Sequence, residues 1–195
     1  METTVIGKEF ESFPKIPRLK RGCIITEKID GSNAQICIGE DGTFQVGSRN
    51  RWLSDEKGKD NSNFCRWATE NKTELLKLGP GRHFGEWWGQ GIQRGYGLME
   101  KRFSLFNPAR WAQEGSNLPS CVSLVPVLYT GDFNDDAVNQ TLETLSLKGS
   151  QAAPGFMSPE GIVVYHIASR TMFKVTLDND AKPKGAIIET PMVEA

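Results

Sequence analysis

The stretch that decides the fold is residues 27–33, which read Glu27-Lys28-Ile29-Asp30-Gly31-Ser32-Asn33. Residues 23–29 form a β-branched run that predicts a strand, and Asp-Gly then favours a turn. Beyond the turn, Ala34, Ile36 and Ile38 alternate with more polar residues, the period of a half-buried strand. Lys28 thus stands at a strand end, where it is expected to project into a cleft mouth. There a neutral lysine can act as a nucleophile, although the string alone also fits a surface lysine before a hairpin turn.

The rest of the chain predicts more strands than helices. Strands are expected at residues 43–47, 82–88, 102–106, 121–130, 161–167 and 171–177, the last two as a hairpin. One helix is expected to follow the N-cap candidates at residues 60–63 and to stop at residues 79–81. A second should begin at Asn134, bury Val138, Leu142 and Leu145, and end near Gly149. The fold class expected is α+β, one domain of mostly antiparallel sheets with a few helices.

Composition excludes several classes of protein. In 195 residues, 38% are hydrophobic and 24% charged, as in one ordinary globular domain. With 23 Lys and Arg against 24 Asp and Glu, the net charge is -1, so any polyanion site must be a local cluster. No membrane association is expected, because the longest apolar-leaning run, residues 121–129, is too short to span a bilayer. The four cysteines form no CxxC pair and no secretory signal precedes them, so we expect reduced thiols and a cytoplasmic protein.

Charged residues stand in or beside several of these strands. Ser48-Arg49-Asn50-Arg51 ends one strand with two arginines, which suits phosphate binding. Glu86 lies inside an otherwise apolar strand, and Glu160 heads another. Lys174 lies in a β run where the period predicts burial. Buried charges are costly unless they are paired or bind a metal, so finding all of them in one chain indicates a site.

This ordered set resembles the covalent nucleotidyltransferases, and most closely the ATP-dependent RNA ligases. The resemblance covers about residues 26–176, and its motifs are Lys28-Ile29-Asp30-Gly31, Ser48-Arg49, Phe84-Gly85-Glu86, Ser104-Leu105-Phe106, Glu160-Gly161-Ile162-Val163 and Phe173-Lys174-Val175. Ser32-Asn33 and residues 89–93, Gly-Gln-Gly-Ile-Gln, are more like the RNA ligases than the DNA ligases. The resemblance implies an ATP-grasp-like nucleotidyltransferase domain.

The resemblance also implies a reaction and its catalytic residues. Lys28 would attack the α-phosphate of ATP to form lysyl-AMP, AMP would pass to a 5′-phosphate end, and a 3′-hydroxyl would then displace it. Glu160 would hold a hydrated Mg²⁺. Lys174 would contact the α-phosphate in the transition state. Members of the family commonly carry two lysines spaced KxK in the last strand, whereas this chain has only Lys174 there.

Five further residues are predicted to bind the nucleotide. By the resemblance, Arg49 binds the ribose or an end phosphate, Glu86 accepts from the ribose hydroxyls, and Phe106 stacks on adenine. Asn33 is assigned to the same site and to the step on the nucleic-acid end. Glu27, which precedes Lys28 in the chain, is also predicted to bind the nucleotide.

We expect residues 1–177 to form the nucleotidyltransferase domain and residues 178–195 a polar tail, with no separate nucleic-acid-binding domain. The partners expected are nucleic-acid ends, RNA more than DNA, with a protein partner possible in place of a C-terminal module. The basic residues that would contact nucleic acid are Lys15, Arg18, Lys20, Arg21 and Arg51, although the first four also fit a solvated surface segment.

Two alternatives to an RNA ligase stay open on sequence. One is a protein that keeps the nucleotide cleft and recognises ends but seals nothing. Against it, a pure binder has no need of a nucleophilic lysine. The other is a nucleotidyltransferase with another acceptor, such as a capping-type enzyme, which would prefer GTP.

Overall fold

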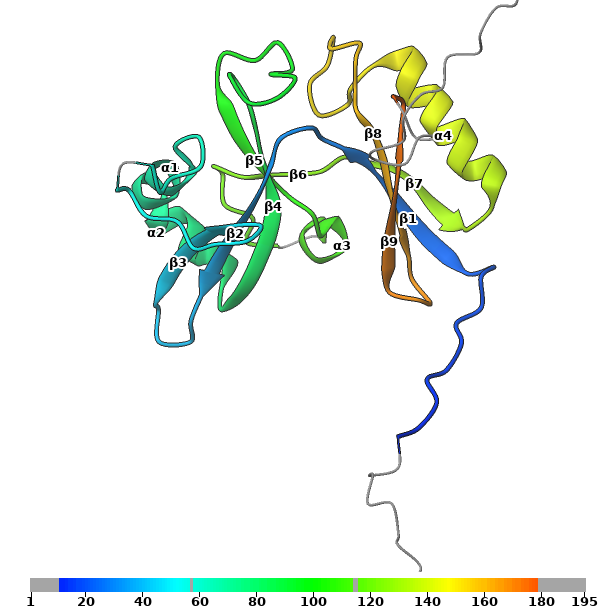
Figure 1. Cartoon of the computed structure of the whole chain (residues 1–195), viewed down its shortest axis with the longest axis horizontal. Helices are drawn as coiled ribbons and strands as arrows, with labels where there is room; N and C mark the ends of the chain where they lie inside the picture. The colour runs from blue at the N-terminus through cyan, green and yellow to red at the C-terminus, as the bar shows by residue number, and fades with distance from the viewer. Residues whose placement is uncertain (1–10, 57, 114–115, 179–195) are drawn as a thin grey trace, which may run out of the picture.

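Two β-sheets lie side by side, and the chain passes directly from one to the other between its first two strands (Figure 1). The computed structural model describes residues 11–56, 58–113 and 116–178. The first sheet has the strand order β7-β1-β8-β9 and the second has the order β3-β2-β4-β5-β6. All pairings are antiparallel except that of β5 with β6. The α+β class predicted from the sequence is confirmed.

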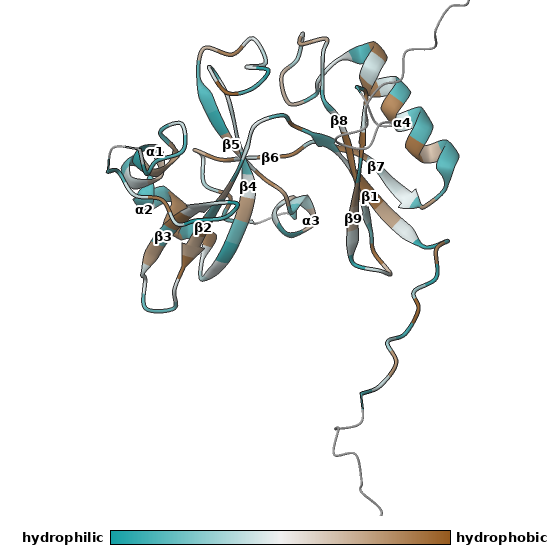
Figure 2. Ribbon diagram, in the orientation of Figure 1, coloured by the Kyte–Doolittle hydropathy of each residue, from teal (hydrophilic) through white to brown (hydrophobic). Residues whose placement is uncertain are grey.

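The first sheet buries one face under a helix. It consists of β1 (Gly22–Lys28), β7 (Val127–Asp132), β8 (Gly161–His166) and β9 (Thr171–Thr176). Cys23, Ile25, Ile162 and Val164 form its apolar face and pack with Leu145 of α4 (Asp135–Lys148). Figure 2 shows hydrophobic and hydrophilic bands alternating along α4, as expected of a helix that lies on a sheet.

The ends of α4 agree with the sequence prediction. The Asn134 side chain accepts a hydrogen bond from the Ala137 N–H at 2.8 Å, which satisfies one free donor of the first turn. Asp135 and Asp136 lie in that turn, where the helix dipole favours acidic groups. Gly149 follows the last turn with a φ of 79°, a conformation that glycine adopts without steric cost.

The second sheet has its own aromatic core. It consists of β2 (Ser32–Ile38), β3 (Phe44–Ser48), β4 (Gly81–Gly89), β5 (Lys101–Leu105) and β6 (Ser123–Leu124). Ala34, Ile36 and Ile38 of β2 face this core, as their alternation predicts. Phe64 of α1 (Phe64–Glu70) packs there, 5.4 Å from Trp87 and 5.2 Å from Phe103 between ring centroids.

Two predicted elements are divided in the structure. The helix expected up to residue 78 breaks at Asn71 into α1, α2 (Lys72–Leu75) and a 3₁₀ turn (Leu76–Leu78). The Asn71 side chain donates to the Trp67 carbonyl at 2.9 Å and so competes with the helical bonding pattern. The strand expected at residues 121–130 becomes β6 and β7 in different sheets, because Pro126 between them has no N–H to donate to a ladder. The short α3 (Pro108–Trp111) has no counterpart in the sequence prediction.

The crossing between the sheets occupies residues 29–31, and Gly31 makes it possible. A Cβ at position 31 would lie 2.6 Å from the Trp87 carbonyl oxygen, 2.8 Å from the Trp88 Cβ and 2.9 Å from the Glu86 Cγ. These atoms belong to the backbone or to the inner parts of side chains in β4, so they cannot move aside easily. Glycine is therefore required by the close approach of β4.

Within the described residues, none of the helices is long and apolar enough to cross a bilayer. The polar tail expected at residues 178–195 lies outside the described residues except for Asp178.

Substituting Gly31→Ala should lower the free energy of unfolding by about 1–3 kcal/mol, the usual cost of forcing a methyl group into a packed site. Gly22→Ala at the other end of β1 is the matched control, since its Cβ would meet the tip of Ile167 at 3.3 Å and the Gly131 carbonyl oxygen at 3.8 Å, an ordinary contact distance. Urea denaturation of both variants measures the difference. Equal midpoints for the two would contradict the proposed steric conflict.

Candidate active site

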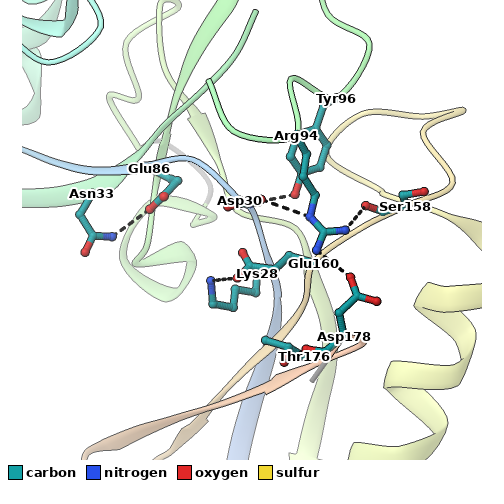
Figure 3. Close-up of polar contacts among 10 residues, drawn as sticks. All are labelled: Lys28, Asp30, Asn33, Glu86, Arg94, Tyr96, Ser158, Glu160, Thr176 and Asp178. Atoms are coloured by element: carbon teal, nitrogen blue, oxygen red, sulfur yellow. Dashed lines mark hydrogen bonds and ion pairs between the residues drawn. The ribbon is translucent and has the colours of Figure 1, made fainter. Parts of the chain in front are cut away.

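Lys28 and Glu160 form an ion pair at the end of β1. The register between β1 and β8 sets Lys28 opposite Gly161, so Glu160, just before β8, lies beside the lysine. The Lys28 Nζ is 2.6 Å from the Glu160 Oε1, and both side chains are half-buried (Figure 3). The sequence prediction named both residues, and the structure brings them into contact across most of the chain length.

Glu27 points to the opposite face of β1, because neighbouring residues of a strand alternate between faces. Its side chain is buried and accepts hydrogen bonds from the Ser150 hydroxyl and from the N–H groups of Gln151 and Ala152, the last two at 2.8 and 3.0 Å. These contacts fasten the segment after α4 to β1. In the structure this carboxylate therefore faces the protein interior and not the side of the sheet that carries Lys28.

Glu86, Asn33 and Arg49 form a hydrogen-bonded chain on the second sheet. Asn33 of β2 lies opposite Glu86 of β4, and its amide donates to the Glu86 Oε2 at 2.9 Å (Figure 3). The Arg49 Nε donates to the Asn33 Oδ1 at 2.8 Å. The three residues that the sequence assigned to one site are thus held together by direct contacts.

Burial raises the pKa of Glu86 to about 7. The hydrogen bonds from Asn33 and from the Gly31 backbone oppose this rise, as does the positive charge of Lys28, while Glu160 adds to it. Because Lys28 and Glu160 of the first sheet both act on Glu86 of the second, the two sheets share one electrostatic site. A carboxyl that changes its charge near neutral pH is typical of functional sites.

Two partly exposed aromatic rings lie on the same face as Glu86. Phe106 follows β5, and its N–H donates to the Phe84 carbonyl at 3.0 Å. Phe84 and Phe106 are 51% and 39% exposed, although rings of this size are usually buried. The sequence prediction assigned Phe106 to the nucleotide and included Phe84 only as a letter of the Glu86 motif, although Phe84 lies two residues before Glu86 and so shares its face.

Lys174 lies on the face of the first sheet that carries Lys28. It is opposite Val163 of β8, which is opposite Thr26 of β1. Its side chain is exposed, so the burial expected from strand periodicity is wrong. The reason is that β9 is the edge strand of its sheet.

The predicted basic residues separate into two places. Arg51 is exposed in the loop after β3, where its carbonyl accepts from the Ser48 N–H at 2.9 Å, and it therefore lies near Arg49. The other four precede β1 in an exposed segment that leaves the strand at the end opposite Lys28 (Figure 1): Lys15, Arg18, Lys20 and Arg21.

Glu160 is suited to a hydrated magnesium ion. Its Oε2 is buried and has no hydrogen-bond partner among the described residues, so the lone pairs of this oxygen are left for another ligand. No group of three or more potential metal ligands forms in the described part of the chain. Mg²⁺ fits such a site, because it keeps several waters and needs only one or two carboxylates with substrate phosphates.

Sequence reasoning missed Arg94 and Tyr96, in the loop between β4 and β5. The Arg94 Nε donates to the Asp30 Oδ2 at 3.1 Å, and the Tyr96 hydroxyl accepts from the Asp30 N–H at 2.8 Å (Figure 3). The signal available is the glycine-rich stretch at residues 89–97, of which only residues 89–93 enter the motif quoted from the sequence.

Comparison with known structures supports the fold. A variant of the Naegleria gruberi RNA ligase with ATP and manganese is 21% identical over 81% of this chain and 50% of its own, with a TM-score of 0.61. A second variant, with AMP and manganese, is 19% identical over the same shares with a TM-score of 0.60. The enzyme with pyrophosphate is 20% identical over 80% of this chain and 50% of its own, with a TM-score of 0.56. The chain therefore spans half the length of these structures.

A comparison with curated protein sequences finds no significant match. A family model described as RNA ligase matches residues 21–176, which is most of the chain and includes both sheets. That range contains the Lys28–Glu160 pair and the chain of contacts from Glu86 to Arg49. The chain belongs to the RNA ligase family.

Proposed function

We propose that this chain joins RNA ends at the expense of ATP, through an AMP adduct on Lys28. The observation that carries the proposal is the ion pair of Lys28 and Glu160, placed beside the buried Glu86 in a chain of the RNA ligase family. The N. gruberi enzymes of the same fold are described with ATP, AMP or pyrophosphate, the substrate and products of such a step. The acceptor would be a 5′-phosphate end, from which a 3′-hydroxyl displaces AMP.

In the first step the Lys28 nitrogen forms a bond to the α-phosphorus of ATP, and the bond from that phosphorus to the pyrophosphate oxygen breaks. The ammonium must first release a proton to water and give up its contact with Glu160, since only the lone pair of the neutral amine can attack. Magnesium at Glu160 would supply charge neutralisation as pyrophosphate leaves. Glu160 would thus hold the lysine in one state and bind the metal in the other.

The contacts around Glu86 support roles for the nucleotide-binding residues. Phe106, with Phe84 opposite, offers an aromatic face for adenine. Glu86 would accept from the ribose hydroxyls, and Arg49 would bind the ribose or an end phosphate. Asn33 bonds to both side chains, so it would fix their positions relative to each other. It would also take part in the later step on the nucleic-acid end.

On the first sheet, Lys174 would reach the phosphates from the face that it shares with Lys28. An exposed lysine on an edge strand has the freedom to follow the phosphate as its geometry changes. The lysine pair spaced KxK in the family has either Met172 or Thr176 in place of its second member here. As the lysine of this strand that shares a face with Lys28, Lys174 would make the α-phosphate contact.

Incubation with ATP labelled at the α-phosphate and Mg²⁺ should attach label to the protein, stable through denaturing electrophoresis. Lys28→Ala should abolish the label, because it removes the nucleophile, while Lys59→Ala, an exposed lysine paired with Glu56, should label normally. Label retained in Lys28→Ala would refute the nucleophile. Stronger labelling from GTP than from ATP would instead favour a capping-type nucleotidyltransferase.

Replacing Glu160→Gln should slow adduct formation by at least about a hundredfold at every magnesium concentration, since metal-assisted charge neutralisation contributes several kcal/mol. Glu100→Gln, an exposed carboxylate paired with Arg102, is the control and should react normally. Rate against magnesium concentration is the measurement. Full recovery of Glu160→Gln at high magnesium would mean that the carboxylate assists binding only.

Glu86 should make stability depend on pH between about 4.5 and 7. A raised pKa means that the folded protein binds more protons than the unfolded chain in this range, so stability is lost as the pH rises. From pH 5 to pH 8 this group should cost about 2–3 kcal/mol. Urea denaturation at both pH values should show this loss in the wild type and its absence in Glu86→Gln. The same loss in both proteins would assign it to another group.

A further inference from the structure

One guanidinium holds together the three segments that lead into the site. The Arg94 Nε donates to the Asp30 Oδ2 at 3.1 Å, its Nη1 to the Ser158 carbonyl at 3.1 Å and its Nη2 to the Asp178 Oδ2 at 2.9 Å (Figure 3). Asp30 is two residues after Lys28, and Ser158 is two residues before Glu160. Arg94 itself touches neither of the paired residues, so it acts on them through the backbone.

The loop that carries Arg94 is built to keep it in place. Ile92 and Tyr96 on either side are buried in the apolar clusters of the second sheet and of the junction between the sheets. The Tyr96 ring lies 5.0 Å from Trp88 and 4.6 Å from Phe156 between centroids. Gln93 and Tyr96 have φ values of 47° and 53°, a region costly for residues other than glycine, so packing must hold this backbone in one conformation.

Asp30 is held at two points from this same loop. Arg94 binds its side chain, while the Tyr96 hydroxyl accepts from its N–H at 2.8 Å. A residue fixed at both backbone and side chain has little freedom, and only Ile29 separates it from Lys28. The loop between β4 and β5 therefore fixes the backbone just after Lys28, and with it the direction of the Lys28 side chain.

The third contact adds the end of β9. Asp178 binds Arg94, and the Thr176 hydroxyl donates to the Asp178 carbonyl at 2.8 Å. Thr176 lies opposite Gly161, the residue after Glu160. The exposed side chain of Asp178 makes this the weakest of the three contacts, because exposed ion pairs contribute little.

We propose that Arg94 is a positioning residue for the AMP-transfer step, holding Lys28 and Glu160 at the separation and angle that attack on ATP requires. The inference rests on the proposed function. Arginine suits the task and lysine does not, because its planar fork can bind three acceptors at once in fixed directions. Misplacement of reacting groups by about 1 Å can cost on the order of a hundredfold in rate.

The test is single-turnover labelling with ATP and Mg²⁺ in wild type, Arg94→Ala, Arg94→Lys, Asp30→Asn and Asp178→Asn. Arg94→Ala should lower the rate constant at saturating ATP by about ten- to a hundredfold, with the half-saturating ATP concentration and the final labelled fraction unchanged. Arg94→Lys should recover only part of the rate, Asp30→Asn should slow the step but by no more than Arg94→Ala, and Asp178→Asn should be the mildest. The double variant Arg94→Ala/Asp30→Asn should be no slower than Arg94→Ala alone, since Arg94→Ala already removes the contact that Asp30→Asn weakens.

Arg110→Ala is the matched control, because Arg110 of α3 also bonds to a backbone carbonyl, that of Leu78 in the 3₁₀ turn, and, among the described residues, to none of the segments that lead to Lys28 or Glu160. Reversal of preformed adduct by pyrophosphate should slow in Arg94→Ala by the same factor as formation, as one transition state serves both directions. If Arg94→Ala does not fold, Arg94→Lys and Asp30→Asn carry the test alone.

Two results would overturn the inference. A lower labelled fraction with an unchanged rate constant would mean that Arg94 only keeps the protein folded. A wild-type rate in Arg94→Lys and Asp30→Asn would mean that the contacts of Arg94 have no part in the AMP-transfer step. Absence of label in the wild type would instead refute the proposed function and this inference with it.

Discussion

The chain crosses from one sheet to the other in three residues, and Gly31 makes that crossing directly against the backbone of β4. Lys28 stands just before the crossing and Asn33 just after it. The ion pair on the first sheet and the hydrogen-bonded chain on the second are therefore placed relative to each other by one close contact. Asp30, in the middle of the crossing, gives the β4–β5 loop a point to hold. No single helix or strand carries the site, because its residues come from both sheets and meet where the two are joined.

Local signals predicted the elements of this fold better than their arrangement. Asn134 and Gly149 mark the ends of α4 because capping depends on only a few neighbouring residues. The pairing of β1 with β7 and β8 depends on segments far along the chain, and alternation alone cannot select among strands of similar pattern. The breaks at Asn71 and Pro126 were readable in principle, since each residue has a known effect on backbone hydrogen bonding, but the apolar pattern on both sides was given more weight.

The site was predicted through its motifs, which are local signals and do not show how distant segments meet. Lys28, Glu160 and Glu86 were found because charges in apolar strands are conspicuous. Glu27 was grouped with them, yet strand alternation turns it to the interior, where it binds the segment after α4. Two adjacent charged residues thus have different surroundings, which the order of residues cannot reveal until the buried face is known. Arg94 was missed because its three partners are distant in sequence, and the glycine-rich run around it does not by itself single out one arginine.

The strand β1 also sets a length scale for any nucleic acid that binds along it. Its seven residues separate the exposed basic segment at one end from Lys28 at the other. A strand of that length spans about 23 Å, which corresponds to about seven base steps of a duplex at about 3.4 Å each. The distance between the basic segment and Lys28 is thus fixed by the number of residues in a single β-strand.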